Sequence, residues 1–237
     1  MVIPCIDMKI ILIGAGNLAT QLAVALQKKG MTPAYIYSRT RKSAEQLSER
    51  LRDVPHSTDI SRVPTDGDLY IFAVKDSALL DLVSRMPANR GLWVHTAGSM
   101  DMEVFAPYTA RYGVFYPMQT FSKERETDFD DIPIFVEANH TDDTERLQEL
   151  AGRLSTKVYE ATSEQRKYLH LAAVFACNFT NHLYALCDRI LSEHGLPFET
   201  MLPLIRETAA KVADMPPAQA QTGPAIRYDK NVIAVSY

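Results

Sequence analysis

The hydrophobic positions in the first two-thirds of the chain alternate between two patterns. Short apolar runs rich in β-branched residues, typical of buried strands, occupy residues 10–14, 34–38, 69–74 and 92–98. Between these runs, apolar residues recur at helical spacing over residues 17–29, 41–51 and 77–86. The alternation predicts parallel strands joined by right-handed crossovers, with helices on both faces of one sheet.

The strand pattern continues towards the middle of the chain. We expect further strands at residues 112–119, 132–138 and 157–161, with a helix at 142–154. Residues 53–60 should hold the third strand but contain few apolar residues, so we expect a very short edge strand there. The fold class is therefore α/β, and an N-terminal Rossmann domain with a mostly parallel sheet is predicted to span residues 1–160.

The pattern becomes helical in the remaining residues, 161–237, which we predict to form a smaller all-helical domain. Thr162 and Gln165 form a capping box at the start of one long helix, and Gly195 ends it. The middle of this helix, residues 171–179, is apolar on all sides, as in a helix that is buried all round. A domain of this size cannot bury it alone, so a partner subunit or the first domain is expected to cover part of it. A second helix is expected at residues 198–213.

A glycine turn joins the first predicted strand to the first helix. Gly14-Ala-Gly16-Asn17-Leu18-Ala19 has the form G-x-G-x-x-A, in which the glycines allow a tight turn and a close backbone approach to a pyrophosphate. The N-terminus of the following helix offers free N–H groups and the positive end of its dipole. The strand–turn–helix context makes this a predicted dinucleotide site, at Gly14, Gly16, Asn17 and Leu18.

The end of the second strand distinguishes between the two nicotinamide cofactors. NAD sites place Asp or Glu there to bind the ribose hydroxyls, whereas this chain has Ser38, Arg39 and Thr40. Hydroxyl and guanidinium donors suit a 2′-phosphate, so NADP(H) is predicted. The alternative is that these residues are simply the charged start of a surface helix.

Two further segments follow strands on the side where α/β sheets bind ligands. Val74 and Lys75 follow the strand at residues 69–74, and Thr96, Ala97 and Gly98 follow the next. We expect them to line the ribose and nicotinamide of the cofactor. Lys75 could equally be a solvated loop lysine.

Polar residues on the first long helix are candidates for the chemistry. Hydride transfer requires a proton donor near the substrate, and His170 lies in an otherwise apolar segment, followed by Asn178 and Asn181. We predict His170 and Asn178 as catalytic residues. Each could instead be a polar residue satisfied within a helical core. His95 is predicted to be structural, and Tyr116 to belong to a pocket wall. Met118, Gln119, Asn181 and Gln221 are predicted to line the substrate pocket between the two domains.

Composition excludes several other classes of protein. The 237-residue chain has a net charge of −4 and no cluster of Lys and Arg, so nucleic acid is not an expected partner. No apolar run is long enough to span a membrane, and no secretory signal precedes the first strand. Three cysteines without a C-x-x-C pair indicate neither a disulfide framework nor a metal site. A cytoplasmic location is expected.

Several motifs together resemble one bacterial family. They are IGAGNLA, YSRT, AVKD, HTAGS, YPMQTF, HLAAVFACNFTNHLYAL and QTGPAIRYDKN. The chain looks like Rossmann-like proteins with a DUF2520-type helical domain, often labelled coenzyme F420-dependent NADP oxidoreductases. The overall plan is also similar to that of pyrroline-5-carboxylate reductase and 6-phosphogluconate dehydrogenase.

The resemblance implies a dinucleotide cofactor and a homodimer formed through the helical domain. In related dehydrogenases a Lys and an Asn on the first long helix assist proton transfer and substrate binding, and His170 and Asn178 occupy comparable positions. In the family, residues 222–231 lead into a further helix, whereas this chain stops soon afterwards, which implies a truncated C-terminus.

Three functions follow from these patterns. The first is NADP(H)-dependent transfer of a hydride to or from a small carbonyl, imine or hydroxy compound. The second, implied only by the family label, is hydride exchange between NADP and the deazaflavin F420. The third is a non-enzymatic NADP sensor or assembly module, because no unambiguous catalytic pair is visible.

Overall fold

The structure is a computed structural model that describes residues 8–222. It divides into two compact units, Met1–Cys177 and Asn178–Tyr237. The first unit therefore includes the beginning of the long helix, and the domain boundary expected between residues 160 and 161 stays a prediction. The end of the family motif, from residue 223 onward, and the C-terminal truncation expected from the resemblance lie outside the described residues.

One sheet of eight strands organises the first unit, in the order β3-β2-β1-β4-β5-β6-β7-β8. The strands are β1 Ile10–Ile13, β2 Tyr35–Tyr37, β3 His56–Ser57, β4 Leu69–Phe72, β5 Leu92–His95, β6 Tyr112–Pro117, β7 Ile134–Ala138 and β8 Val158–Glu160. Neighbouring strands pair in parallel except β6 and β7. The predicted mostly parallel α/β fold is confirmed, and β3 is the short edge strand expected from its few apolar residues.

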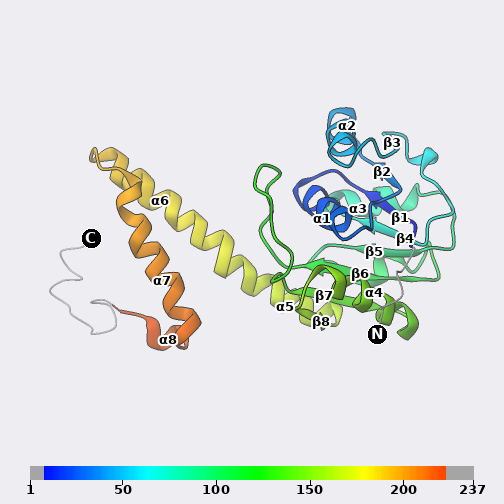
Figure 1. Ribbon diagram of the computed structural model, residues 1–237. Coiled ribbons are helices and arrows are strands. Elements are labelled where there is room, and N and C mark those ends of the chain that lie inside the picture. Colours follow the sequence, from blue (N-terminus) through cyan, green and yellow to red (C-terminus); the bar gives the residue numbers. More distant parts are fainter. Residues whose placement is uncertain (1–7, 223–237) are drawn as a thin grey trace. The chain divides into compact units, whose positions relative to one another are not determined.

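Helices cover both faces of this sheet (Figure 1). They are α1 Asn17–Lys28, α2 Arg41–Arg50, α3 Asp76–Ser84, α4 Thr141–Leu154 and α5 Ser163–Ala173, with short 3₁₀ turns at Ile60–Arg62 and Met102–Phe105. Alternate residues of β1 point to opposite faces, so Ile10 and Leu12 pack with α1, α2 and α4, whereas Ile11 and Ile13 pack with α3. Both faces are therefore buried, which explains the continuous apolar strands.

The carboxyl ends of the parallel strands β1, β2, β4, β5 and β6 meet at one edge of the sheet. This edge carries the glycine turn after β1 and the loops that follow β2, β4 and β5. We call it the carboxyl edge, and the opposite side, where these strands begin, the amino edge. Open α/β sheets bind ligands at the carboxyl edge.

The long helical segment after β8 begins as predicted. Thr162 and Gln165 form the capping box at the N-terminus of α5. The segment is not one regular α-helix, because Val174–Phe179 is π-helical. Hydrogen bonds from i to i+5 change the rotation per residue. Asn178 and Asn181 therefore do not follow His170 at the 3.6-residue period of a regular α-helix.

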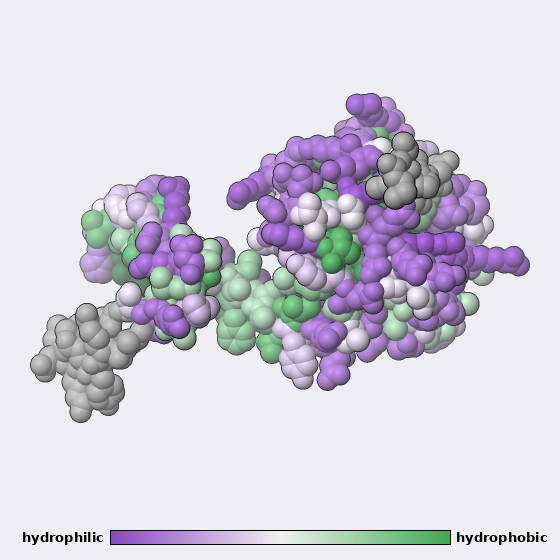
Figure 2. Space-filling view, turned by 60° about the horizontal axis from the view of Figure 1, so that its bottom comes forward, coloured by the Kyte–Doolittle hydropathy of each residue, from purple (hydrophilic) through white to green (hydrophobic). Residues whose placement is uncertain are grey.

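The second unit is helical throughout its described residues. It contains α6 Thr180–Glu193, a 3₁₀ turn at Phe198–Met201, α7 Leu202–Asp214 and α8 Pro217–Ala220. Gly195, with a positive φ of 70°, follows α6 as the expected helix stop. None of these helices has a buried residue. Figure 2 shows hydrophobic side chains at the surface of this unit, where Leu183, Ile190 and Leu204 are each more than half exposed.

Candidate functional site

A cavity of about 230 Å³ lies at the carboxyl edge, around the glycine turn. The loops after β1, β2 and β4 contribute to it, together with one residue from the loop between β6 and β7. Its lining residues are Gly14, Ala15, Gly16, Tyr37, Ser38, Arg39, Thr40, Ser43, Ala73, Val74, Lys75 and Lys123. The structure thus brings together seven of the predicted cofactor residues: Gly14, Gly16, Ser38, Arg39, Thr40, Val74 and Lys75.

The two glycines of the turn have different roles. Gly14 adopts φ of +130°, and a Cβ there would lie 2.2 Å from the carbonyl oxygen of Ala73, so no side chain fits between the strands. Gly16, just before α1, faces open space, since a Cβ there would meet nothing within 4 Å. The free N–H groups of the first turn of α1 are therefore accessible, as a bound phosphate requires.

The charge of the cavity suits a phosphate group. Arg39, Lys75 and Lys123 line it, and no Asp or Glu is among its lining residues. The side chains of these three cations form no hydrogen bond or ion pair with any other residue in the described part of the chain. Ser38, Thr40 and Ser43 add hydroxyl groups. These residues fit a dinucleotide carrying a phosphate on its adenosine ribose.

Asn17 and Leu18, the other two residues assigned to the glycine turn, do not line this cavity. The amide of Asn17 donates to the carbonyl oxygen of Phe121 at 3.0 Å, and Leu18 packs against the hydrophobic core. Their contribution to cofactor binding stays a prediction.

The loop after β5 is held by two buried side chains. His95 is 1% exposed, and its Nδ1 accepts a hydrogen bond from the Ala97 N–H at 3.2 Å. Arg166 of α5 is completely buried, and its Nε donates to the Ala97 carbonyl at 3.2 Å. Both polar groups of the Ala97 backbone are therefore engaged, and the loop that contains Thr96, Ala97 and Gly98 has a fixed conformation.

Arg166 also fixes α5 to the sheet. Its Nη1 lies 2.7 Å from Oε2 of Glu137 on β7, and its Nη2 donates to the Met100 carbonyl. The Ser163 N–H and hydroxyl donate to the same Glu137 carboxylate. The carboxylate at the helix N-terminus is stabilised by these donors and by the helix dipole. This network positions α5, and therefore His170, against the loop after β5.

His95 is held neutral by its surroundings. Burial, followed by the charge of Arg166, lowers the pKa of His95 from 6.5 to about 4. Since Nδ1 accepts a hydrogen bond, the proton of the neutral ring is on Nε2, which lies 3.3 Å from the Asp101 carbonyl. The prediction that His95 is structural agrees with this arrangement.

His170 lies beside the loop after β5 and the end of β6. A Cβ at Gly98 would lie 2.6 Å from His170 Nδ1, so only glycine allows the imidazole this close. The same Nδ1 lies 3.4 Å from the Tyr116 hydroxyl, a long hydrogen bond. Burial raises the pKa of Tyr116, so its phenol stays protonated near neutral pH. Tyr116, which the sequence placed only in a pocket wall, is therefore the partner of His170.

The remaining predicted residues are dispersed. Met118 packs beside Tyr116 at the end of β6, while Gln119 lines a separate surface hollow with the loop residues that follow it. Asn178, Asn181 and Gln221 are exposed residues of the second unit. Their catalytic or substrate-binding roles stay predictions.

Ser43 and Lys123 line the cavity around the glycine turn but were not predicted from the sequence. Ser43 could have been recognised, because it lies in the first turn of α2, directly after the Ser38–Thr40 segment. Lys123 had no local signal, since it comes from the loop between β6 and β7, and only the tertiary fold places it near the glycine turn.

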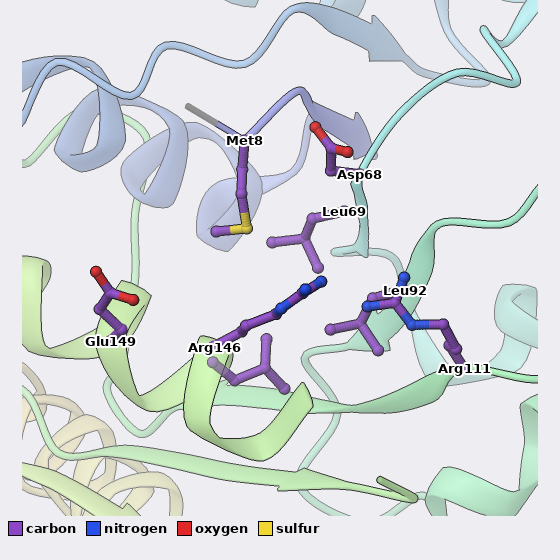
Figure 3. A pocket seen from close by; sticks show the side chains of 8 residues that line it. Met8, Asp68, Leu69, Leu92, Arg111, Arg146 and Glu149 are labelled. Atoms are coloured by element: carbon purple, nitrogen blue, oxygen red, sulfur yellow. The ribbon is translucent and has the colours of Figure 1, made fainter. Parts of the chain in front are cut away.

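A second cavity, of about 340 Å³, lies at the amino edge of the sheet (Figure 3). Arg146 extends from α4 over its apolar floor, near Leu69, and Arg111 stands at its side (Figure 3). Arg111 is already bound by Asp143: its Nε donates to Oδ2 at 3.0 Å and its Nη2 to Oδ1. This cavity includes none of the predicted site residues and carries carboxylates, Asp68 and Glu149, among its lining.

Two further searches cover only the described residues. No group of three or more His, Cys, Asp or Glu side chains within residues 8–222 could hold a metal ion. None of the helices in that range is long and apolar enough to cross a membrane.

The fold and the glycine turn define a Rossmann-like α/β protein with a helical C-terminal region. The family description "Rossmann-like domain" matches residues 3–118, and "Domain of unknown function (DUF2520)" matches residues 132–236. The chain belongs to this family of Rossmann-like proteins with a DUF2520 domain. The expected family is confirmed.

Solved structures support the same assignment. A Bacteroides fragilis protein with the provisional name NADP oxidoreductase is 52% identical, with a TM-score of 0.89 over 97% of this chain and 90% of that one. An Aspergillus terreus reductive aminase, in complex with NADPH and ethyl levulinate, is 16% identical, with a TM-score of 0.70 over 87% of this chain and 74% of its own.

A more distant structure shares the same plan. A 1-pyrroline-5-carboxylate reductase from Streptococcus pyogenes is 14% identical, with a TM-score of 0.63 over 94% of this chain and 84% of its own. At this identity it shows a shared fold, as does the reductive aminase. No curated protein sequence matches the chain.

Proposed function

We propose that the protein is an NADP(H)-dependent oxidoreductase that transfers a hydride to or from a small carbonyl, imine or hydroxy compound. One observation carries the proposal: the cavity around the glycine turn contains Arg39, Lys75 and Lys123 but no carboxylate. A site for NAD(H) would use Asp or Glu to bind the ribose hydroxyls, and such a group would repel a 2′-phosphate. The provisional name of the Bacteroides fragilis relative is consistent with this function.

The residues of this cavity and of the loop after β5 would each hold a different part of the cofactor. The backbone at Gly14 and Gly16 and the N-terminus of α1 would receive the pyrophosphate. Ser38, Arg39, Thr40 and the neighbouring Ser43 would hold the phosphorylated ribose. Val74 and Lys75, after β4, and Thr96 to Gly98, after β5, would continue towards the nicotinamide.

His170 would exchange the proton that accompanies hydride transfer. Bound NADP(H) supplies or accepts the hydride itself. Tyr116 engages Nδ1 of His170, and Nε2 has no hydrogen-bond partner among the described residues. We therefore assign Nε2 as the atom that gives a proton to, or takes one from, the substrate oxygen or nitrogen. Tyr116 orients the ring and selects the neutral tautomer with its proton on Nε2.

The helical unit would complete the enzyme as a homodimer. Leu183 and Leu204 are both 62% exposed although they belong to helices with an apolar face, and no residue of α6 or α7 is buried. A second copy of the chain would cover this surface. Sedimentation of the full chain should show a dimer that Leu183→Glu dissociates, and a monomeric wild type would contradict this arrangement.

The other predicted residues are proposed to contact the substrate. They are Met118, Gln119, Asn178, Asn181 and Gln221.

Calorimetry tests the cofactor. The protein should bind NADPH more tightly than NADH, since only NADPH carries the 2′-phosphate. Equal affinities, or tighter binding of NADH, would refute the assignment of Ser38, Arg39 and Thr40.

A screen of small ketones, with and without amines, tests the chemistry by following NADPH oxidation. With any compound that turns over, His170→Ala should lower kcat about 100-fold or more, the typical contribution of a positioned acid or base. Tyr116→Phe should have a smaller effect. Unchanged turnover in His170→Ala would show that His170 is not the residue that exchanges the proton.

A further inference from the structure

The loop between β6 and β7, residues 118–133, connects distant parts of the first unit. From the end of β6 it passes over α1, a helix roughly a hundred residues earlier in the chain, before returning to the sheet (Figure 1). Phe129 of this loop is 3% exposed and stacks on Phe121, with ring centroids 5.7 Å apart. Apolar contacts therefore hold the loop at both ends.

Gln21 fixes the middle of this loop. Its side chain is buried in α1, and its Nε2 donates to the carbonyl oxygens of Ser122 at 2.6 Å and Arg125 at 2.9 Å. Its Oε1 accepts from the Thr127 N–H at 3.2 Å. A buried amide bonded at both its nitrogen and its oxygen is costly to displace, so the loop has a defined place on α1.

Lys123 is held on the other side by α2. Nη1 of Arg50, the last residue of that helix, donates to the Lys123 carbonyl oxygen at 3.0 Å. Helix α2 starts directly after Ser38, Arg39 and Thr40. The backbone of Lys123 is therefore fixed between the two helices that flank the cofactor cavity, and its side chain lines that cavity.

Within residues 8–222, the ammonium group of Lys123 forms no ion pair, and Glu126, three residues further along, is engaged by Lys28. Arg39 and Lys75 line the same cavity, so the three like charges disfavour one another when nothing is bound. An anionic ligand removes this repulsion.

We propose that Lys123 is a specificity-determining residue that binds the adenosine 2′-phosphate together with Arg39. This inference rests on the proposed NADP(H) function and adds a residue from the opposite half of the domain. We assign the 2′-phosphate rather than the pyrophosphate because Lys123 shares its cavity with Arg39 and with Ser43 of the first turn of α2. The Arg50 contact ties Lys123 to the same helix. The loop of residues 118–133 thus forms a wall of the cavity, placed by Gln21.

The experiment compares four ligands by calorimetry: NADPH, NADH, 2′,5′-ADP and 5′-AMP. Lys123→Gln should raise the Kd of NADPH and of 2′,5′-ADP about ten-fold, the effect of losing one charge-assisted hydrogen bond. The Kd values of NADH and 5′-AMP should change less than about two-fold. The matched control is Lys42→Gln, which removes an exposed lysine of α2 that does not line the cavity. It should change every Kd by less than about two-fold.

The other possible results distinguish a failure of this inference from a failure of the proposed function. An unchanged Kd for both 2′-phosphorylated ligands in Lys123→Gln would overturn the inference and leave the proposed function standing. An equal loss for all four ligands would place Lys123 on the 5′-phosphate that they share, and a loss confined to NADPH and NADH would place it on the rest of the pyrophosphate. Either result would overturn the inference. A wild type that binds NADPH no better than NADH would overturn the inference and the proposed cofactor together.

Discussion

The cations at the two edges of the sheet have different partners. At the amino edge, Arg111 is bound twice by the buried carboxylate of Asp143, and Lys9 is paired with Asp66. At the carboxyl edge, Arg39, Lys75 and Lys123 line one cavity without any carboxylate. Both edges carry cavities and arginines, but the partners of the cations differ.

The difference separates structural charges from ligand-binding charges. A buried carboxylate such as Asp143 needs its cation, because an unpaired charge in the interior is strongly unfavourable. Arg39, Lys75 and Lys123 are not required by any carboxylate in the described chain, so their removal should leave the fold intact. Mutations at the two edges should therefore affect different measurements.

The largest effect is expected at the amino edge. Arg111→Ala leaves Asp143, which is 2% exposed, without its partner. It should lower the free energy of unfolding by about 3–5 kcal/mol. Urea denaturation measures this loss, while calorimetry on the folded variant should show an unchanged Kd for NADPH. Arg146→Ala, in the same cavity but without an ion pair there, is the control and should shift stability by about 0.5 kcal/mol or less. Equal effects of the two variants would mean that the Asp143 pair is not structural.

The next effect concerns His95 at the carboxyl edge and depends on pH. Its folded pKa of about 4 lies below its ordinary 6.5, so between these values the unfolded chain binds a proton that the folded chain does not. Stability should therefore fall as pH is lowered from 6.5 to 4, by about 3 kcal/mol in total from this group.

The control for this pH dependence is His95→Asn, whose amide oxygen can still accept from the Ala97 N–H. The difference in unfolding free energy between wild type and variant isolates the imidazole from the other histidines. It should be constant above pH 6.5 and shrink below it. A difference that does not vary with pH would show that His95 is not held neutral.

Arg39→Gln should produce the opposite pattern from Arg111→Ala. The Kd of NADPH should rise about 10- to 100-fold, equivalent to about 1.5–3 kcal/mol, through loss of a charge-assisted contact to phosphate. The free energy of unfolding should change by about 0.5 kcal/mol or less, because Arg39 is exposed and forms no ion pair within residues 8–222. Arg41→Gln removes a neighbouring arginine that pairs with Glu45 instead, and it should leave the Kd nearly unchanged.

The smallest effect on stability is expected at Gly16. Gly16→Ala introduces a Cβ into open space, so the free energy of unfolding should change by at most about 1 kcal/mol. The same methyl group would obstruct the approach of a phosphate, so the Kd of NADPH should rise. Gly152→Ala in α4 also meets open space and should leave cofactor binding unchanged. Unchanged NADPH binding in Gly16→Ala would show that the glycine turn does not bind the cofactor.

Local patterns in the sequence were enough to predict most of the first unit. Every expected strand from β1 to β8 formed. The buried parallel strands were predictable because they require continuous apolar runs that are visible in any single segment, and β3, with few apolar residues, is the short edge strand. The capping box at Thr162 and the stop at Gly195 were also readable, since both depend on residues a few positions apart. The π-helical segment at Val174–Phe179 was not readable, because hydrogen bonding from i to i+5 leaves no periodic signature in so short a stretch.

The sequence by itself therefore determined the α/β fold, the glycine turn and the absence of a carboxylate after β2. Only the tertiary structure decided which distant residues share the site: Lys123 beside Arg39, Tyr116 beside His170, and Arg166 between α5 and the loop after β5. The reason is physical. Backbone turns and strand burial depend on neighbours in the chain, whereas a phosphate or a proton is held by side chains that converge from several elements, and such convergence has no sequence spacing of its own.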